Sequence, residues 1–324
     1  KKPEKIYEDK NIMGIIKAFK LGFDYLKYDE DGNVEATQRA VNDVNLDIEA
    51  GQFVAVLGHN GSGKTTIIKC LTGIYKPDQG TVTLDGKPVY ENTAVKEKIG
   101  YVADSNHMFS SYKVKKMVAL YKNLYPDFSK DEFEKLNLIF QVNTNKRISQ
   151  LSKGQQMRVS FMLNMARKPE VMILDEPTSG LDAIAKKDLL DILVTSVENN
   201  DMMVLISSHH LSELEKICDD VTLIRDGRIY VQDELEEVTA KMAKYQLVFP
   251  EGAPGELYHR KDVCHISNVG SVYTVVLPGT DEIFEEEMRK QGAVVVEQMP
   301  MGLEESFIYM NRQNDADYIT GGDN

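Results

Sequence analysis

The stretch Gly58-His59-Asn60-Gly61-Ser62-Gly63-Lys64-Thr65 decides the fold of this chain. It follows an apolar segment, Phe53 to Leu57, that predicts a buried strand, and it runs into residues Lys64 to Leu71, which predict a helix. Glycines at this spacing let backbone N–H groups turn towards an anion, and the helix directs its positive end to the same point. Lys64 adds a mobile cation, and the hydroxyl of Thr65 can hold Mg²⁺. The stretch therefore predicts a phosphate-binding loop in a nucleotide site.

Length and composition indicate an ordinary globular protein. The 324 residues suffice for one large domain and a smaller appendage, and 42% of them are hydrophobic. The net charge of −13 is spread along the chain, and no basic patch argues for a nucleic-acid partner. No apolar run reaches the ~18 residues that cross a bilayer, and residues Lys1 to Asp9 lack the apolar core of a secretion signal. We therefore expect a protein that stays in the cytosol.

The three cysteines carry no recognisable function. Cys70, Cys218 and Cys264 are far apart in the sequence, and no pair has the spacing of metal ligands. We expect buried, reduced thiols.

The phosphate-binding loop and the hydrophobic pattern together predict an α/β protein with a P-loop NTPase core. From Leu21 to Leu84, apolar and polar residues alternate between turns, which predicts a small antiparallel sheet around the phosphate loop. Residues Met108 to Gln150 have helical periodicity, broken at Pro126, and predict an inserted helical lobe. From Val171 to Arg225, short apolar strands alternate with helices, as in a mainly parallel sheet covered on both faces.

Past about Glu237 the pattern changes again and predicts a small C-terminal α/β domain. Four strand-like segments are expected there, with helices at 282–290 and 303–310. The expected domains are a flexible tail (1–12), a nucleotide-binding domain (13–236) with a helical subdomain at about 107–167, an accessory domain (237–312) and a disordered tail (313–324).

Two carboxylates end a strongly apolar segment, Val171-Met172-Ile173-Leu174-Asp175-Glu176-Pro177. A buried strand of this kind delivers acids to the carboxyl edge of a sheet, beside a bound phosphate. Adjacent strand residues face opposite ways, so the two acids can have different roles. We expect Asp175 to bind Mg²⁺ and Glu176 to act as the base for the attacking water. The alternative is a strand end with solvated acids.

Five segments, in one order, resemble those of the nucleotide-binding subunit of ABC transporters over about residues 20 to 236. They are the phosphate loop, Leu151-Ser152-Lys153-Gly154-Gln155, Ile173-Leu174-Asp175-Glu176, Ser179-Gly180-Leu181-Asp182 and Ser207-Ser208-His209. Residues 13 to about 64 look most like the energising subunits of energy-coupling-factor uptake systems for vitamins and metal ions. Residues from Ile99 onwards look like bacterial exporter subunits that carry a small C-terminal domain.

The resemblance implies ATP and Mg²⁺ as ligands. It implies Mg²⁺ ligation by Thr65 and Asp175, and catalytic roles for Lys64, Glu176 and His209. His209 would be the switch histidine on the γ-phosphate, with His210 as the competing candidate. The implied nucleotide-binding residues near the phosphate loop are Gly58, Asn60, Gly61, Ser62, Gly63, Lys64, Thr65 and Thr66. Tyr25, or else Tyr28, would stack on adenine, although packing on a strand face explains both equally.

A second edge of the domain is implied to bind ATP held by another subunit. Ser152, Gly154 and Gln155 begin an expected helix, Lys153 to Arg167, and offer a hydroxyl and backbone donors to an anion, although a helix cap alone explains them. In the family this edge docks onto the nucleotide of the opposite subunit. The resemblance thus implies a head-to-tail homo- or heterodimer, with Asp182 at the same interface.

Two positions depart from the family pattern. Lys153 stands where the family usually has a glycine after the signature serine. Asp104, after the expected strand Ile99 to Ala103, stands where the family has a glutamine that links the metal to the membrane partner. A carboxylate can coordinate Mg²⁺, although Asp104 is one methylene shorter. Coupling through Asp104 is therefore a hypothesis.

Together these features predict an ATPase that dimerises on ATP and drives export through separate membrane-spanning permease subunits, at the cytoplasmic face of the membrane. One alternative is the energising ATPase of a vitamin or metal-ion uptake system. Another is an ATP-dependent regulatory switch, for which residues 237 to 312 would be the docking platform.

Overall fold

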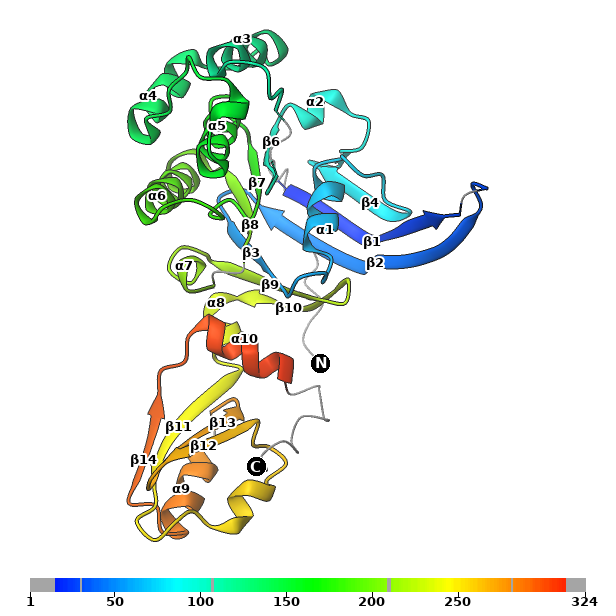
Figure 1. Ribbon diagram of the computed structural model, residues 1–324. Helices are drawn as coiled ribbons and strands as arrows, with labels where there is room; N and C mark the ends of the chain where they lie inside the picture. The colour runs from blue at the N-terminus through cyan, green and yellow to red at the C-terminus, as the bar shows by residue number, and fades with distance from the viewer. Residues whose placement is uncertain (1–14, 30, 106–107, 209–210, 281, 313–324) are drawn as a thin grey trace. The chain divides into compact units, whose positions relative to one another are not determined.

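The computed structural model describes residues 15–29, 31–105, 108–208, 211–280 and 282–312, and the chain divides into two compact units (Figure 1). The first unit contains the described residues up to Ser208 together with Ile217–Gln232. The C-terminal unit contains Leu211–Lys216 and the described residues from Asp233 onwards. This division falls slightly before the expected boundary at residue 237. The expected tails, 1–12 and 313–324, lie outside the described residues.

A six-stranded sheet, in the order β10-β9-β3-β8-β7-β6, forms the centre of the first unit (Figure 1). Its strands are β3 (Phe53–Leu57), β6 (Ile99–Val102), β7 (Val171–Asp175), β8 (Met203–Ser207), β9 (Asp220–Arg225) and β10 (Arg228–Glu234). The pairs from β9 to β6 are all parallel. Every residue of β3, β7 and β8 is buried, as their apolar runs require. The carboxyl ends of these strands meet at one edge of the sheet.

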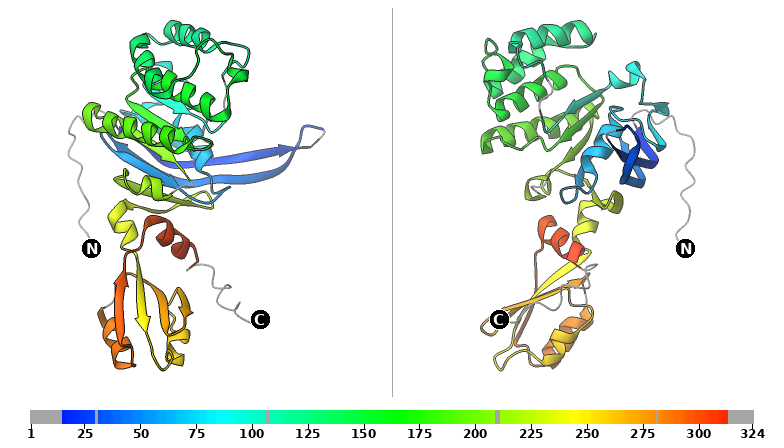
Figure 2. Two further views of the ribbon diagram at one scale, coloured as in Figure 1. Left: turned by 60° about the vertical axis from the view of Figure 1, so that its left-hand side comes forward. Right: turned by 45° about the vertical axis from the view of Figure 1, so that its right-hand side comes forward.

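A second sheet, of order β2-β1-β4-β5, is antiparallel. It consists of β1 (Ile15–Tyr28), β2 (Val34–Glu49), β4 (Gln79–Leu84) and β5 (Lys87–Pro88). The pairing of β1 with β4 reaches only to Gly22, whereas its pairing with β2 continues to Tyr28. The last part of the hairpin is therefore a two-stranded ribbon that extends beyond β4 (Figure 2). The predicted antiparallel sheet is present, but β3, from the same stretch, belongs to the parallel sheet.

Helices cover both sheets and form the predicted helical lobe. They are α1 (Lys64–Leu71), α2 (Thr93–Lys96), α3 (Val114–Leu124), α4 (Lys130–Phe140), the 3-10 turn η1 (Ile148–Gln150), α5 (Lys153–Met165) and α6 (Ala183–Asn200). Helix α1 contacts β1, β2 and β7 and so lies between the two sheets, while α3 and α4 pack on α5, which packs on β6. Within the described residues, none of the helices combines the length and the apolar character needed to span a bilayer.

The C-terminal unit is built on an antiparallel sheet of order β12-β13-β11-β14. Its strands are β11 (Met242–Val248), β12 (His265–Val269), β13 (Val272–Pro278) and β14 (Val295–Met299), and its helices are α7 (Leu211–Leu214), α8 (Leu235–Thr239), the 3-10 turn η2 (Gly255–His259), α9 (Glu282–Lys290) and α10 (Leu303–Arg312). Tyr245, Phe249 and Phe284 are fully buried in its core. Helix α10 packs against α7, α8 and β11. The unit therefore has a hydrophobic core of its own.

The cysteines differ in burial. Within the described residues no cysteine forms a disulfide, and Cys70 and Cys218 are buried in the first unit. Burial raises the pKa of Cys70 to about 12 and raises that of Cys218 further. Cys264 is only partly buried, so the expectation of a buried thiol is wrong there.

Candidate nucleotide site

A cavity of about 560 Å³ lies at the carboxyl edge of the parallel sheet, a volume within the usual range of small-molecule sites. It brings the phosphate loop together with residues that follow β6 and β7 and with both long strands of the antiparallel sheet. The lining residues are Tyr25, Gln38, Arg39, Ala40, Asn60, Gly61, Ser62, Gly63, Lys64, Thr65, Thr66, Asp104, Asp175, Glu176, Asp226 and Gly227. Most of the predicted nucleotide, metal and catalytic residues thus face one space.

The phosphate loop has the backbone that its glycines predict. A Cβ at Gly58 would lie 2.4 Å from the carbonyl oxygen of Ile224, and one at Gly63, where φ is +105°, would lie 2.6 Å from that of Ala40. Helix α1 begins at Lys64 without a side-chain cap, so the N–H groups of its first turn remain available to an anion. The buried hydroxyl of Ser62 has no hydrogen-bond partner in the described part of the chain. These donors fit phosphate oxygens.

Lys64 is 7% exposed and is held by the loop itself. Its Nζ donates to the carbonyl oxygens of Gly58, at 2.6 Å, and His59, at 3.1 Å. Burial lowers the pKa of Lys64, and the negative charges of Glu176 and Asp175 oppose this shift. An anionic phosphate would exchange these neutral acceptors for stronger, charge-assisted ones. The ammonium group is thus positioned for a triphosphate.

The two acids at the end of β7 are organised by one hydroxyl of the neighbouring strand. Asp175 is 2% exposed and lies opposite Ser207 in the parallel register. The Oγ of Ser207 donates to Asp175 Oδ1 at 2.7 Å and accepts from the backbone N–H of Glu176 at 3.0 Å. Glu176 has a φ of +50°, a conformation that costs roughly 1–3 kcal/mol and clusters at functional sites. The backbone therefore leaves the strand conformation at Glu176, whereas the prediction treated both acids as residues of one strand.

Tyr25 lines the cavity and is 40% exposed. Its hydroxyl shares a hydrogen bond of 3.0 Å with Oγ1 of Thr66, and its ring meets Phe23 edge-on at 5.1 Å. Tyr28, the alternative, is 57% exposed and is not among the lining residues. Tyr25 combines a packed edge with access to the cavity, and its stacking on a base stays a prediction.

The predicted second edge does not line this cavity. Ser152 Oγ accepts from the N–H of Gln155, and Gln155 Oε1 accepts from the N–H of Ser152, each at 3.2 Å, which forms a capping box at the start of α5. A Cβ at Gly154 would lie 2.5 Å from the carbonyl oxygen of Gly180. Asp182 caps α6 through the N–H of Ala185. These residues have structural roles within one chain, and their contact with a second subunit's ATP stays a prediction.

Asp182 has a further partner, Arg158 on α5. The hydrogen bond from the backbone of Ala185, aided by the guanidinium of Arg158, holds the pKa of Asp182 below its ordinary value. The start of α6 is thus tied to α5.

The histidine prediction lies outside the described residues. Strand β8 ends at Ser207, and both His209 and His210 belong to the short segment that the structure leaves undescribed. A catalytic role for His209 stays a prediction.

Sequence reasoning missed several lining residues. Gln38 and Arg39 lie on β2 opposite Tyr25 and Asp24 of β1, a register that only the strand pairing reveals. Gly227 approaches the phosphate loop, since its N–H donates to the carbonyl oxygen of Ser62 at 2.9 Å. Had the sequence analysis predicted a long hairpin at Tyr25, the residues that pair with Tyr25 and Asp24 would have been candidates for the cavity lining.

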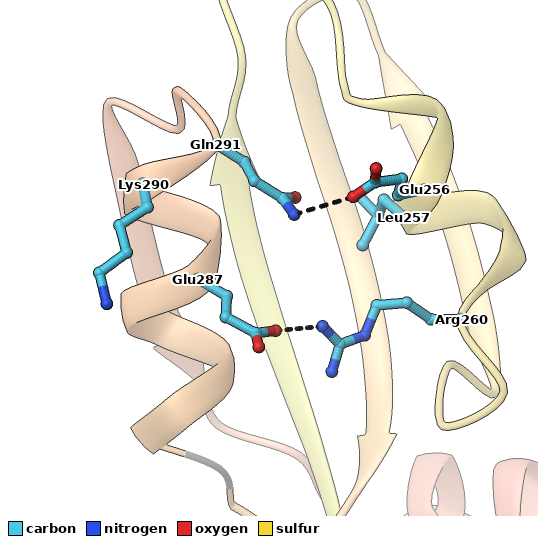
Figure 3. A pocket seen from close by; sticks show the side chains of 6 residues that line it. All are labelled: Glu256, Leu257, Arg260, Glu287, Lys290 and Gln291. Atoms are coloured by element: carbon cyan, nitrogen blue, oxygen red, sulfur yellow. Dashed lines mark hydrogen bonds and ion pairs between the residues drawn. The ribbon is translucent and has the colours of Figure 1, made fainter.

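A smaller cavity, of about 390 Å³, lies in the C-terminal unit (Figure 3). Four of its polar side chains are directed at one another in pairs: Arg260 pairs with Glu287, and Gln291 donates to Glu256 at 3.4 Å, whereas Lys290 points away from them. Arg260 also pairs with Asp262. Because these groups satisfy each other, the phosphate-loop cavity is the better candidate for a ligand site.

Comparison with known proteins gives one consistent result. Residues 41–179 match a family model described as ABC transporter. The chain is 31% identical over 278 residues to the ABC transporter ATP-binding protein YtrB of Bacillus subtilis (strain 168), which covers 86% of this chain and 93% of that protein. The solved structure of cbiO1 from Clostridium perfringens, part of the ABC transporter complex cbiONQ, is 28% identical, with a TM-score of 0.56 over 71% of this chain and 92% of that chain.

The dimeric, post-hydrolysis structure of the ATP-binding cassette MJ0796, bound to ADP and Pi, shares the fold. It has a TM-score of 0.60 at 24% identity and covers 68% of this chain and 98% of that chain. The predicted α/β, P-loop NTPase fold is thereby confirmed. Because the similarity to YtrB runs along most of both chains, this chain belongs to the ABC transporter family and is an ATP-binding ATPase of that family.

Proposed function

We propose that this chain hydrolyses ATP to power the export of a compound through separate membrane-spanning permease subunits, at the cytoplasmic face of the membrane. The observation that carries this proposal is the cavity that brings Lys64 of the phosphate loop together with Asp175 and Glu176. Hydrolysis of a triphosphate requires a cation, a metal-binding acid and a residue that orients water, all at one place. The resemblance of the residues from Ile99 onwards to exporter subunits supports the direction.

The residues fit Mg²⁺ that arrives together with ATP. Within the described residues, no group of three or more His, Cys, Asp or Glu side chains is placed to hold a metal ion unaided. Mg²⁺ is usually bound by one or two carboxylates, with water and substrate phosphates completing its shell. Thr65 and Asp175 offer a hydroxyl and a buried carboxylate to the same cavity. We assign them as ligands; when bound, the ion would offset negative charge on the phosphoryl group.

The residues assigned to the nucleotide site then have separate tasks. Lys64 moves its ammonium group from the loop carbonyls to the phosphates, where it stabilises developing charge. Glu176 orients the attacking water and accepts its proton. Ser207 fixes both acids, since it binds the side chain of Asp175 and the backbone of Glu176. His209 is assigned to the γ-phosphate on the resemblance.

A second copy of the chain, or a related subunit, would complete the site. The start of α5 exposes Ser152 and Lys153, and the capping box fixes the backbone there. A helix start with a fixed backbone is suited to bind the phosphates of ATP held by a facing subunit. We propose a head-to-tail dimer in which Ser152, Gly154, Gln155 and Asp182 lie at the interface.

A groove of about 310 Å³ in the first unit is the proposed docking site for a permease. It is lined by Ala103 and Ser105, on either side of Asp104, and by apolar residues of the helical lobe, among them Phe109 and Leu124, which are 58% and 57% exposed. A segment of the membrane partner seated here would contact the chain beside the nucleotide cavity. We expect F109D to reduce co-purification of the permease without lowering ATP binding, whereas I184D, at an exposed site on α6, would leave both unchanged.

The hydrolytic role is tested with Glu176→Gln. Loss of the base should lower the ATPase rate about 10²- to 10⁴-fold, while binding of a fluorescent ATP analogue is retained. The matched control is Glu198→Gln, at an exposed position near the end of α6. An E176Q protein that hydrolyses ATP at the unmodified rate would exclude Glu176 as the base.

The transport role is tested by what accompanies the protein from membranes. We expect mass spectrometry of the tagged chain, purified in mild detergent, to identify a protein with several membrane spans, and inside-out vesicles with both proteins to accumulate substrate on ATP. Isolation of a soluble regulator alone would instead support the regulatory switch. Loss of substrate from such vesicles would indicate uptake.

A further inference from the structure

The two departures from the family pattern meet in the structure. The Nζ of Lys153, at the first position of α5, lies 2.8 Å from Oδ1 of Asp104, which follows β6. The same ammonium group is 3.4 Å from the hydroxyl of Ser179. An ideal Cβ on Gly180 would lie 3.8–3.9 Å from the Lys153 side chain, so its stem runs over this backbone. One side chain therefore joins the start of α5, the loop after β7 and the edge of the nucleotide cavity.

Local electrostatics at α5 do not explain a lysine there. The first turn of a helix carries the positive end of its dipole, where a cation is unfavourable, and α5 has no acidic residue in that turn. The compensating charge comes from the cavity. Its charged lining residues are the cations Arg39 and Lys64 and the carboxylates Asp104, Asp175, Glu176 and Asp226. Acids outnumber cations in a space proposed to bind a polyphosphate, and Lys153 pairs with one of these acids, Asp104.

We propose that Lys153 is an exchangeable counter-ion of Asp104: it holds this carboxylate while the site lacks nucleotide, and it is displaced when Asp104 turns to the Mg²⁺ that accompanies ATP. The inference rests on the proposed function of the same cavity. Both side chains are about half exposed, 56% for Lys153 and 49% for Asp104, so the pair is weak enough to exchange. Lys153 and Asp104 are thus positioning residues that connect metal entry to the release of the start of α5.

The exchange makes Lys153 a competitor for the metal. Removal of the Lys153 charge should therefore favour the binding of Mg²⁺ only if the Asp104 carboxylate is present to bind the ion in place of Lys153. A general electrostatic effect would behave differently, because loss of a nearby positive charge favours a cation whether or not Asp104 carries a carboxylate. The two explanations are separated by a double-mutant cycle.

The experiment measures the Mg²⁺ concentration that half-saturates binding of a fluorescent, non-hydrolysable ATP analogue to the full chain. We expect K153Q to lower this concentration about two- to fivefold, the range of an exposed ion pair, and K153R to match the unmodified protein. D104N should raise it, and D104N/K153Q should equal D104N. The control is K187Q, which removes an exposed lysine paired with Asp191 at 2.7 Å on α6 and should change nothing.

Two results would overturn the proposal: a K153Q midpoint equal to that of the unmodified protein, or an equal decrease in midpoint from K153Q in the D104N background. Failure of the proposed function gives a different pattern. In that case the unmodified chain binds no analogue, or K64A binds it as well as the unmodified chain does.

Discussion

The start of α5 packs closely against the loop after β7 at two glycines, Gly154 and Gly180. Gly154 was predicted as a residue that faces ATP of a second subunit, yet it is buried and abuts the carbonyl oxygen of Gly180. Gly180 itself has a φ of +77°, a conformation that other residues seldom adopt. Both glycines are therefore required by the fold of one chain, before any dimer forms.

Substitution of Gly154 by alanine tests this requirement. The new methyl group would lie 2.5 Å from a backbone oxygen, so α5 or the loop must shift, at a cost of about 1–3 kcal/mol in the free energy of unfolding. Urea unfolding followed by circular dichroism measures the loss. G255A is the control, because a Cβ at Gly255 meets no heavy atom within 4 Å. Equal stability of the two variants would show that the close approach is not needed.

At the residue scale, the sequence predicted which side chains lie at the site better than it predicted the contacts between them. The positions of Asp175 and Glu176 follow from the apolar run before them, because a buried strand must end at the edge of its sheet. The role of Ser207 could not be predicted, since it depends on the register between β7 and β8. The pairing of Lys153 with Asp104 joins residues that are 49 positions apart for the same reason.

At the scale of elements, predictions succeeded where an apolar signal was strong. Helix α9 has the predicted bounds, and strand β7 begins with the predicted apolar segment at Val171 and ends at the first of its two acids, Asp175. Strand β10 was missed because most of its residues are polar and exposed, as suits the edge of a sheet. The helical lobe was predicted from its periodic apolar residues, but two of these, Leu124 and Ile139, are 57% and 46% exposed. The periodicity therefore predicted the positions of the helices in the sequence more reliably than it predicted which of their residues are buried.

Substitutions of Ser152 can separate its role as the cap of α5 from its proposed role in binding the ATP of a second subunit. S152A removes the hydroxyl that accepts from the N–H of Gln155 and should destabilise the protein by about 1 kcal/mol in urea unfolding. S152D keeps a capping oxygen and should restore the stability, but its negative charge would oppose a phosphate from a second subunit.

Size-exclusion chromatography with ATP, in the E176Q background, distinguishes the two roles of Ser152. We expect S152D to remain monomeric at concentrations at which the parent protein dimerises. Dimerisation of S152D at the parent's concentration would confine Ser152 to capping.

At the scale of the whole molecule, the reactivity of the thiols probes the two units separately. Burial raises the pKa of Cys70 and Cys218 in the first unit, so few thiolates form there, whereas Cys264 of the C-terminal unit is partly exposed. We expect Ellman's reagent at pH 8 to modify one thiol rapidly in the native protein and none rapidly in C264S. Rapid reaction of a second thiol would show that the core of the first unit opens readily.

The path of the chain between the units also limits how they can be recombined. Strand β8 ends at Ser207, whose hydroxyl holds Asp175, and α7, the next described helix, packs against α10 near the end of the described chain. Residues 211–216 thus belong to the C-terminal unit although 217–232 return to the first. A chimera spliced only at residue 233 would pair α7 with a foreign partner. A working domain graft must therefore transplant the short internal segment along with the tail.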